Sequence, residues 1–179
     1  MVGVVAALLT ATTAVAYNSV VSTHTREYGP GNTENDKSEW LRSNGDDYRE
    51  VVEELRPTEV PVPPGFSYTA DVDAFIKWTT KEPALIQVTS VRSSYAYWAK
   101  CAWEREWLAA HAAGDGPRRA EATAILRDVP SWPLIVATAS GSTVDHLRTV
   151  AQAADRGDGD PVRRDVENNC RPLPAEGSR

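Results

Sequence analysis

The chain has 179 residues, with 19 Lys and Arg against 25 Asp and Glu, and a formal net charge of -6. Hydrophobic residues make up 41% of the chain, which is enough for a buried core and excludes a wholly disordered protein. The acidic balance argues against a nucleic-acid partner, and two cysteines are too few for a four-cysteine zinc site or a disulfide-dense miniprotein.

Residues 1–23 contain no charged side chain. A helix of about 20 such residues is long enough to cross the hydrocarbon core of a bilayer. We therefore expect residues 1–23 to form a transmembrane anchor that contacts the lipid bilayer through residues 2–21. Two alternatives stay open, a signal peptide cleaved after Ala14-Val15-Ala16 and a buried core helix. The missing basic start weighs against the signal peptide, and the missing polar face weighs against the core helix.

Residues 24–64 are expected to form an acidic, proline-rich linker that contains a short helix. Within residues 24–60, ten acidic side chains stand against five basic ones. Asp46 or Asp47 can cap the short helix, whose apolar residues follow helical spacing. The segment 61–65, Pro-Val-Pro-Pro-Gly, is then a stiff extended connector.

Residues 65–170 are expected to form an all-α domain, a small helical bundle built from helical hairpins. The strongest helix signal runs from Ser94 to Ala113, where apolar residues fall on two faces. One face carries Tyr97, Trp98, Cys101 and Leu108, and the other carries Ala96, Ala99, Trp103, Trp107 and Ala110. A helix that is apolar on two sides packs between neighbours, so we expect this segment to be the central helix of the domain.

The remaining elements of the domain follow from caps and turns. The β-branched stretch from Pro83 to Ser94 lacks an obvious partner strand, which favours a helix or an extended segment over a sheet. Two turns of similar sequence, in 112–119 and 154–164, each follow one helix and open the next. Ser142, with Asp145 three residues later, resembles a capping box. Residues 171–179 are expected to be a flexible tail.

Cys101 and Cys170 are expected to form a disulfide, because two cysteines of one small exported domain usually pair. Such a bridge closes a long loop, for which chain-entropy models give about 4 kcal/mol of stability. The alternative is two unrelated buried thiols. The expected disulfide is the reason for placing the domain outside the cytoplasm.

Known catalytic and metal-binding spacings are missing from the sequence. It contains no HExxH or CxxC motif and no phosphate-binding glycine loop. We therefore expect no catalytic, cofactor or metal site. A Ser-His-Asp site built from Ser140 or Ser142, Asp145 and His146 is disfavoured, because Ser142 and Asp145 are already assigned to a helix cap.

An acidic cluster lies at Asp155, Asp158 and Asp160. Carboxylates around a glycine-containing loop can bind Ca²⁺, but the twelve-residue calcium-loop pattern is incomplete here. The cluster is better explained as an Asp/Gly turn.

The chain has six tryptophans. Core packing is their default use, and a stacking groove for sugars or a peptide is the functional alternative. The candidate binding surface consists of Trp98, Trp103, Trp107 and Trp132.

Several short motifs between residues 61 and 170 carry a resemblance to one class of proteins. They are Cys101-x-Trp103, Trp107-Leu108, Gly114-Asp115, Pro130-x-Trp132-Pro133, Val150-Ala151 followed by Gly157-Asp158, and Asn169-Cys170. Together with 15 Arg against 4 Lys, they make the chain resemble small membrane-anchored or exported proteins of high-GC actinobacteria. The resemblance implies an extracytoplasmic helical domain of unknown function and supplies no catalytic residues.

The sequence thus favours a membrane-anchored, extracytoplasmic interaction or accessory module that is not an enzyme. Its partners would be the bilayer and a protein at the cell envelope. The alternative is a secreted cell-envelope enzyme, such as a cell-wall hydrolase, whose carboxylates are paired only by the fold. Glu104 and Glu106 are the first candidates for that role.

Overall fold

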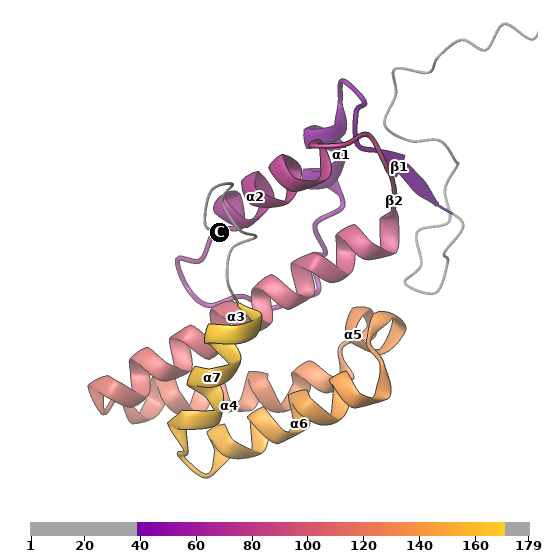
Figure 1. Ribbon diagram of the computed structural model, residues 1–179. Helices are drawn as coiled ribbons and strands as arrows, with labels where there is room; N and C mark the ends of the chain where they lie inside the picture. The colour runs from indigo at the N-terminus through magenta and orange to yellow at the C-terminus, as the bar shows by residue number, and fades with distance from the viewer. Residues whose placement is uncertain (1–38, 171–179) are drawn as a thin grey trace, which may run out of the picture.

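A computed structural model describes residues 39–170 (Figure 1). The predicted anchor, residues 1–23, and the predicted tail, residues 171–179, lie outside the described residues. Among residues 39–170, no helix combines the length and the apolar character needed to cross a bilayer. The membrane anchor therefore stays a prediction.

Helices dominate the described part of the chain, which confirms the all-α class. The elements in chain order are β1 (Trp40–Arg42), α1 (Tyr48–Glu54), α2 (Thr69–Thr79), β2 (Leu85–Gln87), α3 (Val88–Ala113), α4 (Gly116–Asp128), the 3-10 turn η1 (Val129–Ser131), α5 (Pro133–Thr138), α6 (Gly141–Asp155) and α7 (Gly159–Asn169).

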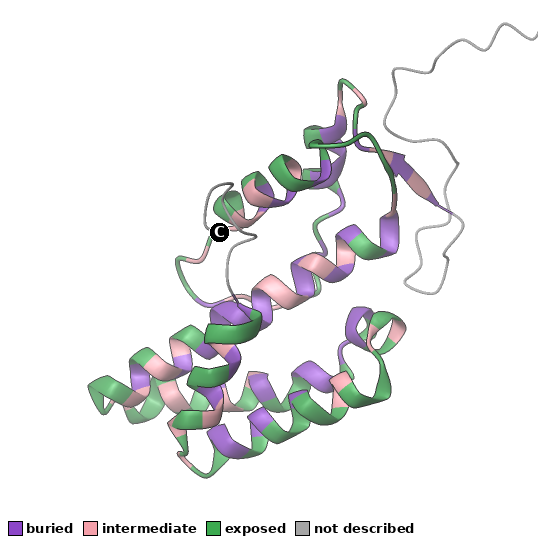
Figure 2. Ribbon diagram, in the orientation of Figure 1, coloured by how far each residue is buried: buried purple, intermediate pink, exposed green. Residues whose placement is uncertain are grey.

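The predicted central helix is present as α3, and it extends further towards the N-terminus than its sequence signal. It crosses the whole molecule, with α1 and α2 on one side and α4 to α6 on the other, and α7 packs across it (Figure 1). Buried residues occur along its full length (Figure 2), as expected of a helix with two apolar faces. Each half of α3 has its own apolar core, one around Trp107 and one around Tyr95.

Residues 39–64 belong to the fold, which corrects their assignment to a linker. Leu41 and Val52 are fully buried against the first half of α3. The Tyr95 hydroxyl donates a hydrogen bond to the Val52 carbonyl at 2.9 Å, and the indole of Trp103 donates to the Pro61 carbonyl at 2.9 Å. An acidic composition concealed this packing, because charged residues surround the buried apolar ones, such as Leu41 and Val52.

Residues 83–94 are partly a strand, and the partner strand lies in the segment assigned to the linker. β2 pairs with β1 in antiparallel register, with Leu41 opposite Ile86. The strand is three residues long and runs directly into α3 at Val88. The partner could not be predicted because β1 is equally short and lies 45 residues away at the pair Leu41 and Ile86.

The two turns of similar sequence have the same structure. After α3, Gly114 has a φ of 66°, and the N–H groups of Gly114 and Asp115 bond back to the carbonyls of His111 and Ala110. This is a Schellman motif, which uses a left-handed residue to satisfy the last carbonyls of a helix. Asp115 then caps α4 by accepting a hydrogen bond from the Arg118 N–H.

The turn between α6 and α7 repeats each step. Gly157 has a φ of 74°, and the N–H groups of Gly157 and Asp158 bond to the carbonyls of Ala154 and Ala153. Asp158 caps α7. The two predicted helical hairpins, α3–α4 and α6–α7, are therefore connected by equivalent turns.

The cap of α6 is Ser140, not Ser142 as the spacing predicted. The Ser140 hydroxyl accepts a hydrogen bond from the Thr143 N–H at 3.3 Å. Asp145 forms an ion pair with Arg148 at 2.8 Å. The predicted capping box fails because α6 begins one residue before Ser142, at Gly141.

We predict that Gly114→Ala and Gly157→Ala each lower the free energy of unfolding by about 1 kcal/mol, because an L side chain is strained at positive φ. A Cβ at either position meets no atom within 4 Å, so the cost is conformational and not steric. Gly141→Ala is the matched control, since its Cβ is equally free and its φ is helical. It should stabilise α6 by about 0.5 kcal/mol. Urea denaturation of the three variants measures these changes, and equal effects at all three positions would contradict the assignment.

Candidate functional site

The predicted disulfide is present, because the sulfur atoms of Cys101 and Cys170 lie at bonding distance, 2.07 Å apart. Cys101 lies in the middle of α3, and Cys170 follows the last residue of α7. The bridge joins residues 69 positions apart and holds the end of α7 against the central helix. It is the fixed point around which the other groups of the site are arranged.

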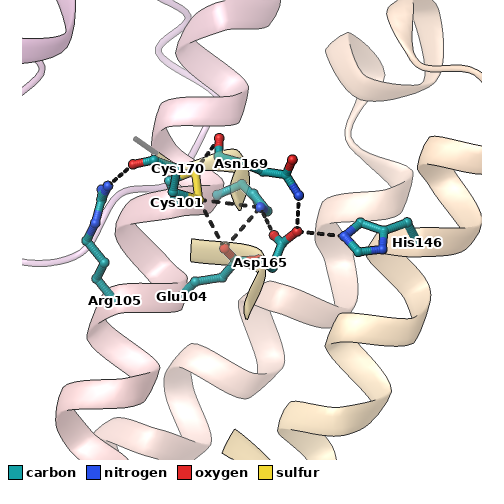
Figure 3. Close-up of polar contacts among 8 residues, drawn as sticks. Cys101, Glu104, Arg105, His146, Asp165, Asn169 and Cys170 are labelled. Carbon is teal, nitrogen blue, oxygen red and sulfur yellow. Dashed lines mark hydrogen bonds and ion pairs between the residues drawn. A yellow bond between two sulfur atoms is a disulfide. The ribbon is translucent and has the colours of Figure 1, made fainter. Parts of the chain in front are cut away.

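A cluster of charged side chains is buried beside the disulfide, where α7 crosses α3 (Figure 3). We call Lys100, Glu104 and Asp165 the polar cluster. Their side chains are only 3%, 1% and 1% exposed. Lys100 and Glu104 are four residues apart on α3, with Lys100 Nζ 2.9 Å from Glu104 Oε2, and the same ammonium forms an ion pair with Asp165 of α7.

Two further side chains connect the polar cluster to the surface. His146 of α6 lies with Nε2 at 2.6 Å from Asp165 Oδ1, and its side chain is 51% exposed. The amide of Asn169 donates to the same Asp165 oxygen. Lys100, Asp165 and His146 therefore form a continuous chain of polar contacts from the buried Glu104 to solvent.

The two carboxyl groups of the polar cluster are driven to opposite charge states. Burial raises the pKa of Glu104 to about 9, against the opposing effect of Lys100 and with a further increase from the Asp165 charge. Burial would also raise the pKa of Asp165, but the contacts with Glu104, Lys100 and His146 outweigh it and hold that pKa well below its usual range. At neutral pH the cluster therefore contains a neutral Glu104 beside an ion pair of Lys100 and Asp165.

Glu104 is in direct contact with the disulfide. Its Oε2 lies 3.3 Å from Cys170 Sγ, and Lys100 Nζ lies 3.6 Å from the same sulfur. Its other oxygen, Oε1, is buried and has no hydrogen-bond partner among the described residues. A protonated carboxyl and an ammonium beside one sulfur are the groups that can protonate or stabilise a thiolate there.

Three potential metal ligands also meet at this point. Cys101, Glu104 and Cys170 offer ligand atoms within 4.8 Å of one another. Thiolates are the sulfur ligands of metals, and both sulfurs are bonded to each other here. The oxidised chain therefore offers a single carboxyl at this position.

Next to the disulfide, a groove of about 250 Å³ runs between α2 and α3. Helical spacing places one stripe of each helix along the α2–α3 groove. The stripes are Asp71, Ala74, Phe75 and Trp78 on α2, and Ser94, Tyr97, Trp98, Cys101 and Arg105 on α3, and Asn169 and Cys170 close one end.

Aromatic rings form much of the α2–α3 groove. Phe75 and Trp98 pack edge to face with ring centroids 5.8 Å apart. Trp78 is 59% exposed, which is unusual for the largest apolar side chain and marks a surface available for contact. Asp71 is half-buried at the groove, and burial raises its pKa against the opposing charge of Arg105. The Arg105 guanidinium donates to the Cys170 carbonyl.

The four tryptophans predicted as a binding surface are not brought together on one surface. Trp98 lines the α2–α3 groove, whereas Trp103, Trp107 and Trp132 are buried in the core. Trp107 is fully enclosed and donates its indole N–H to the Thr123 hydroxyl at 2.9 Å. These three therefore pack the core, which was the default use. Sequence reasoning did not include Trp78 in the binding surface. The signal that could have identified it is its spacing of seven residues from Asp71, which places both residues on one face of α2.

The remaining candidates from the sequence have structural partners. Glu106 pairs with Arg118 at 2.6 Å and does not converge with Glu104. His146 contacts Asp165 and not Asp145, so no Ser-His-Asp arrangement forms around it. His111 stacks on Trp107 with ring centroids 4.9 Å apart.

The acidic cluster after α6 is a turn, as expected. Asp155 pairs with Arg127, Asp158 caps α7, and Asp160 pairs with Arg163. The three carboxylates are thus used by separate local interactions.

Comparison of the chain with protein-family models, with curated proteins and with solved structures found no match.

We predict that the free energy of unfolding decreases as the pH rises from 5 towards 9. The folded-state pKa of Glu104, about 9, is above its ordinary value of 4.5, so its contribution to stability is full at low pH and is lost as the pH rises through this window. The slope from one such group is at most about 1.4 kcal/mol per pH unit.

Glu104→Gln should remove this slope, because glutamine cannot ionise. Glu106→Gln is the control, since it removes a carboxyl from the same helix that is paired with Arg118 at the surface. Chemical denaturation at several pH values, with the disulfide intact, measures the effect. A slope that survives in Glu104→Gln would assign it to another group.

Proposed function

We propose that the protein is a membrane-anchored interaction module whose helical domain lies outside the cytoplasm and binds a protein partner in the α2–α3 groove. Residues 2–21 would hold it in the bilayer, and the disulfide is suited to an oxidising compartment. The observation that carries the proposal is Trp78, 59% exposed at the rim of a groove lined by other aromatic rings.

The groove fits a partner segment that presents a basic side chain. Trp78, Trp98 and Tyr97 supply aromatic faces, over which an ammonium or guanidinium group is attracted by about 0.5–2 kcal/mol. Asp71 supplies a negative charge in the groove, where the charge of Arg105 also acts on it. The net charge of -6 would also accelerate encounter with a basic partner.

The geometry supports binding more than hydrolysis by paired carboxylates. The carboxyls that do converge are Glu104 and Asp165, with Lys100 bridging them. Each side chain is 1% exposed, so a sugar chain has no access to a position between them.

We predict that peptides selected for binding to the full chain carry Lys or Arg next to an apolar residue. Trp78→Ala should weaken their binding about 10-fold, the scale of an interface hot spot, and Asp71→Asn should weaken basic peptides more than neutral ones. Val136→Ala is the matched control, because Val136 is equally exposed at 61% but lies on α5, away from the groove. A displayed peptide library and calorimetry provide the measurement. Selected peptides that bind all three variants equally would place the binding site elsewhere.

We predict further that the full chain, expressed in bacteria, sediments with membranes and resists extraction by carbonate. Deletion of residues 2–21 should release it, because the remaining chain has lost its uncharged segment. Protease added to spheroplasts should digest the domain outside the cytoplasm. A domain that is protected in intact spheroplasts and digested only after lysis would contradict the proposed orientation.

A further inference from the structure

We propose that the Cys101–Cys170 disulfide undergoes thiol–disulfide exchange with a cysteine thiol of a partner protein, and that Glu104 donates the proton to the leaving sulfur of Cys170. The inference goes beyond partner binding and is independent of how the chain is attached to the membrane. It rests on two features that meet at one disulfide: the α2–α3 groove, which both cysteines line, and the buried Glu104, which contacts Cys170 (Figure 3).

The α2–α3 groove makes the disulfide accessible to an attacking thiolate. Both cysteines line the end of the α2–α3 groove, and they are 6% and 5% exposed. A disulfide that only ties two helices together has no need of such an opening. The groove gives an attacking thiolate a path to the bridge from the side of α2.

The side chains of Glu104 and Lys100 can provide acid catalysis. Glu104 Oε2 is 3.3 Å from Cys170 Sγ, and Lys100 Nζ is 3.6 Å from it. No equivalent pair contacts Cys101 among the described residues, where the only polar contact of its sulfur is the Asn169 carbonyl at 3.9 Å. This asymmetry assigns Cys170 as the leaving sulfur, because a sulfur that can be protonated or paired with a cation leaves more readily.

Stability alone does not account for Glu104. Its Oε1 is buried and lacks a hydrogen-bond partner among the described residues, and an unsatisfied buried polar atom costs about 1–3 kcal/mol. A buried neutral acid in contact with a disulfide is suited to proton transfer, and such groups are characteristic of functional positions.

The exchange balances in two steps. The partner thiolate attacks Cys101 Sγ, which forms a mixed disulfide and breaks the Cys101–Cys170 bond, while the Glu104 proton moves to the Cys170 sulfur. Glu104 is then a carboxylate next to Lys100. A second thiolate of the partner attacks the partner sulfur of the mixed disulfide and releases the Cys101 thiolate, so the partner dithiol is oxidised and this chain is reduced by two electrons.

The polar cluster also offers a route for restoring the proton. Lys100 contacts both Glu104 and Asp165, and Asp165 contacts His146, which is 51% exposed. These contacts connect the acid to solvent through His146 on α6, a residue that does not line the α2–α3 groove.

The test uses reduced glutathione as the attacking thiol and the full oxidised chain as its substrate. Samples taken over time are quenched with acid, alkylated and analysed by mass spectrometry at pH 6 to 10. The rate constant per thiolate should be about 100-fold lower in Glu104→Gln than in the wild-type chain near neutral pH. It should fall in the wild type as the pH passes about 9, where Glu104 loses its proton, and stay constant in Glu104→Gln.

Glu106→Gln should react like the wild type, because Glu106 pairs with Arg118 at the surface. Equal rate constants in the wild type, Glu104→Gln and Glu106→Gln at every pH would overturn the proposal.

A second measurement needs no variant. The mixed disulfide with glutathione, trapped early in the wild-type reaction, should be on Cys101. Glutathione found on Cys170, or equally on both cysteines, would overturn the assignment of the leaving sulfur. The reaction with glutathione does not depend on the selection of a binding peptide. Exchange that depends on Glu104, without any selected peptide, would support the exchange proposal and not the binding proposal. Selected peptides without exchange that depends on Glu104 would support the binding proposal alone.

Discussion

The contact between α7 and α3 is the constraint on which the rest of the structure depends. It encloses Lys100, Glu104 and Asp165, and taking charged groups out of water is costly unless each one finds a partner. The cluster limits this cost by containing one cation, one anion and one neutral acid. Removing Lys100 or Asp165 would leave an uncompensated buried charge, so this ion pair helps to fix the position of α7 on α3.

The disulfide stabilises this contact between α7 and α3. A bridge across 69 positions contributes about 4 kcal/mol by restricting the unfolded chain. It also links the polar cluster to the aromatic groove, because Cys101 and Cys170 line the groove while Glu104 contacts Cys170. Binding in the groove and proton chemistry in the cluster therefore meet at the same pair of atoms.

The sequence was informative wherever local pattern determines structure. The two apolar faces of residues 94–113 identified the central helix, and the repeated Gly-Asp-Gly turns identified both hairpins. Cysteine count and expected compartment were enough to predict the disulfide. Each of these inferences used residues close together in the chain, or a pair that had no other partner.

Features that depend on distant segments could not be predicted. Lys100 and Glu104 have the spacing of an exposed ion pair, and only α7, some sixty residues later, covers them with Asp165. β1 pairs with β2 across 45 positions at Leu41 and Ile86, which is why an acidic segment that is buried at Leu41 and at other positions was assigned to a linker. The tryptophans show the same limit, since Trp78 and Trp107 differ in exposure through their neighbours and not through their own helices.

The place where the chain enters the domain determines how mechanical load would reach it. Anything that pulls on the chain ahead of Trp40 acts first on β1, whose three residues are held to β2 and to the core around Tyr95. The Trp103–Pro61 hydrogen bond lies further along the path, and the region around Trp107 is secured behind it by a covalent crosslink. Force applied at the N-terminal end would therefore unfold the part of the domain around Tyr95 first. The disulfide and Glu104 would stay in place at that stage.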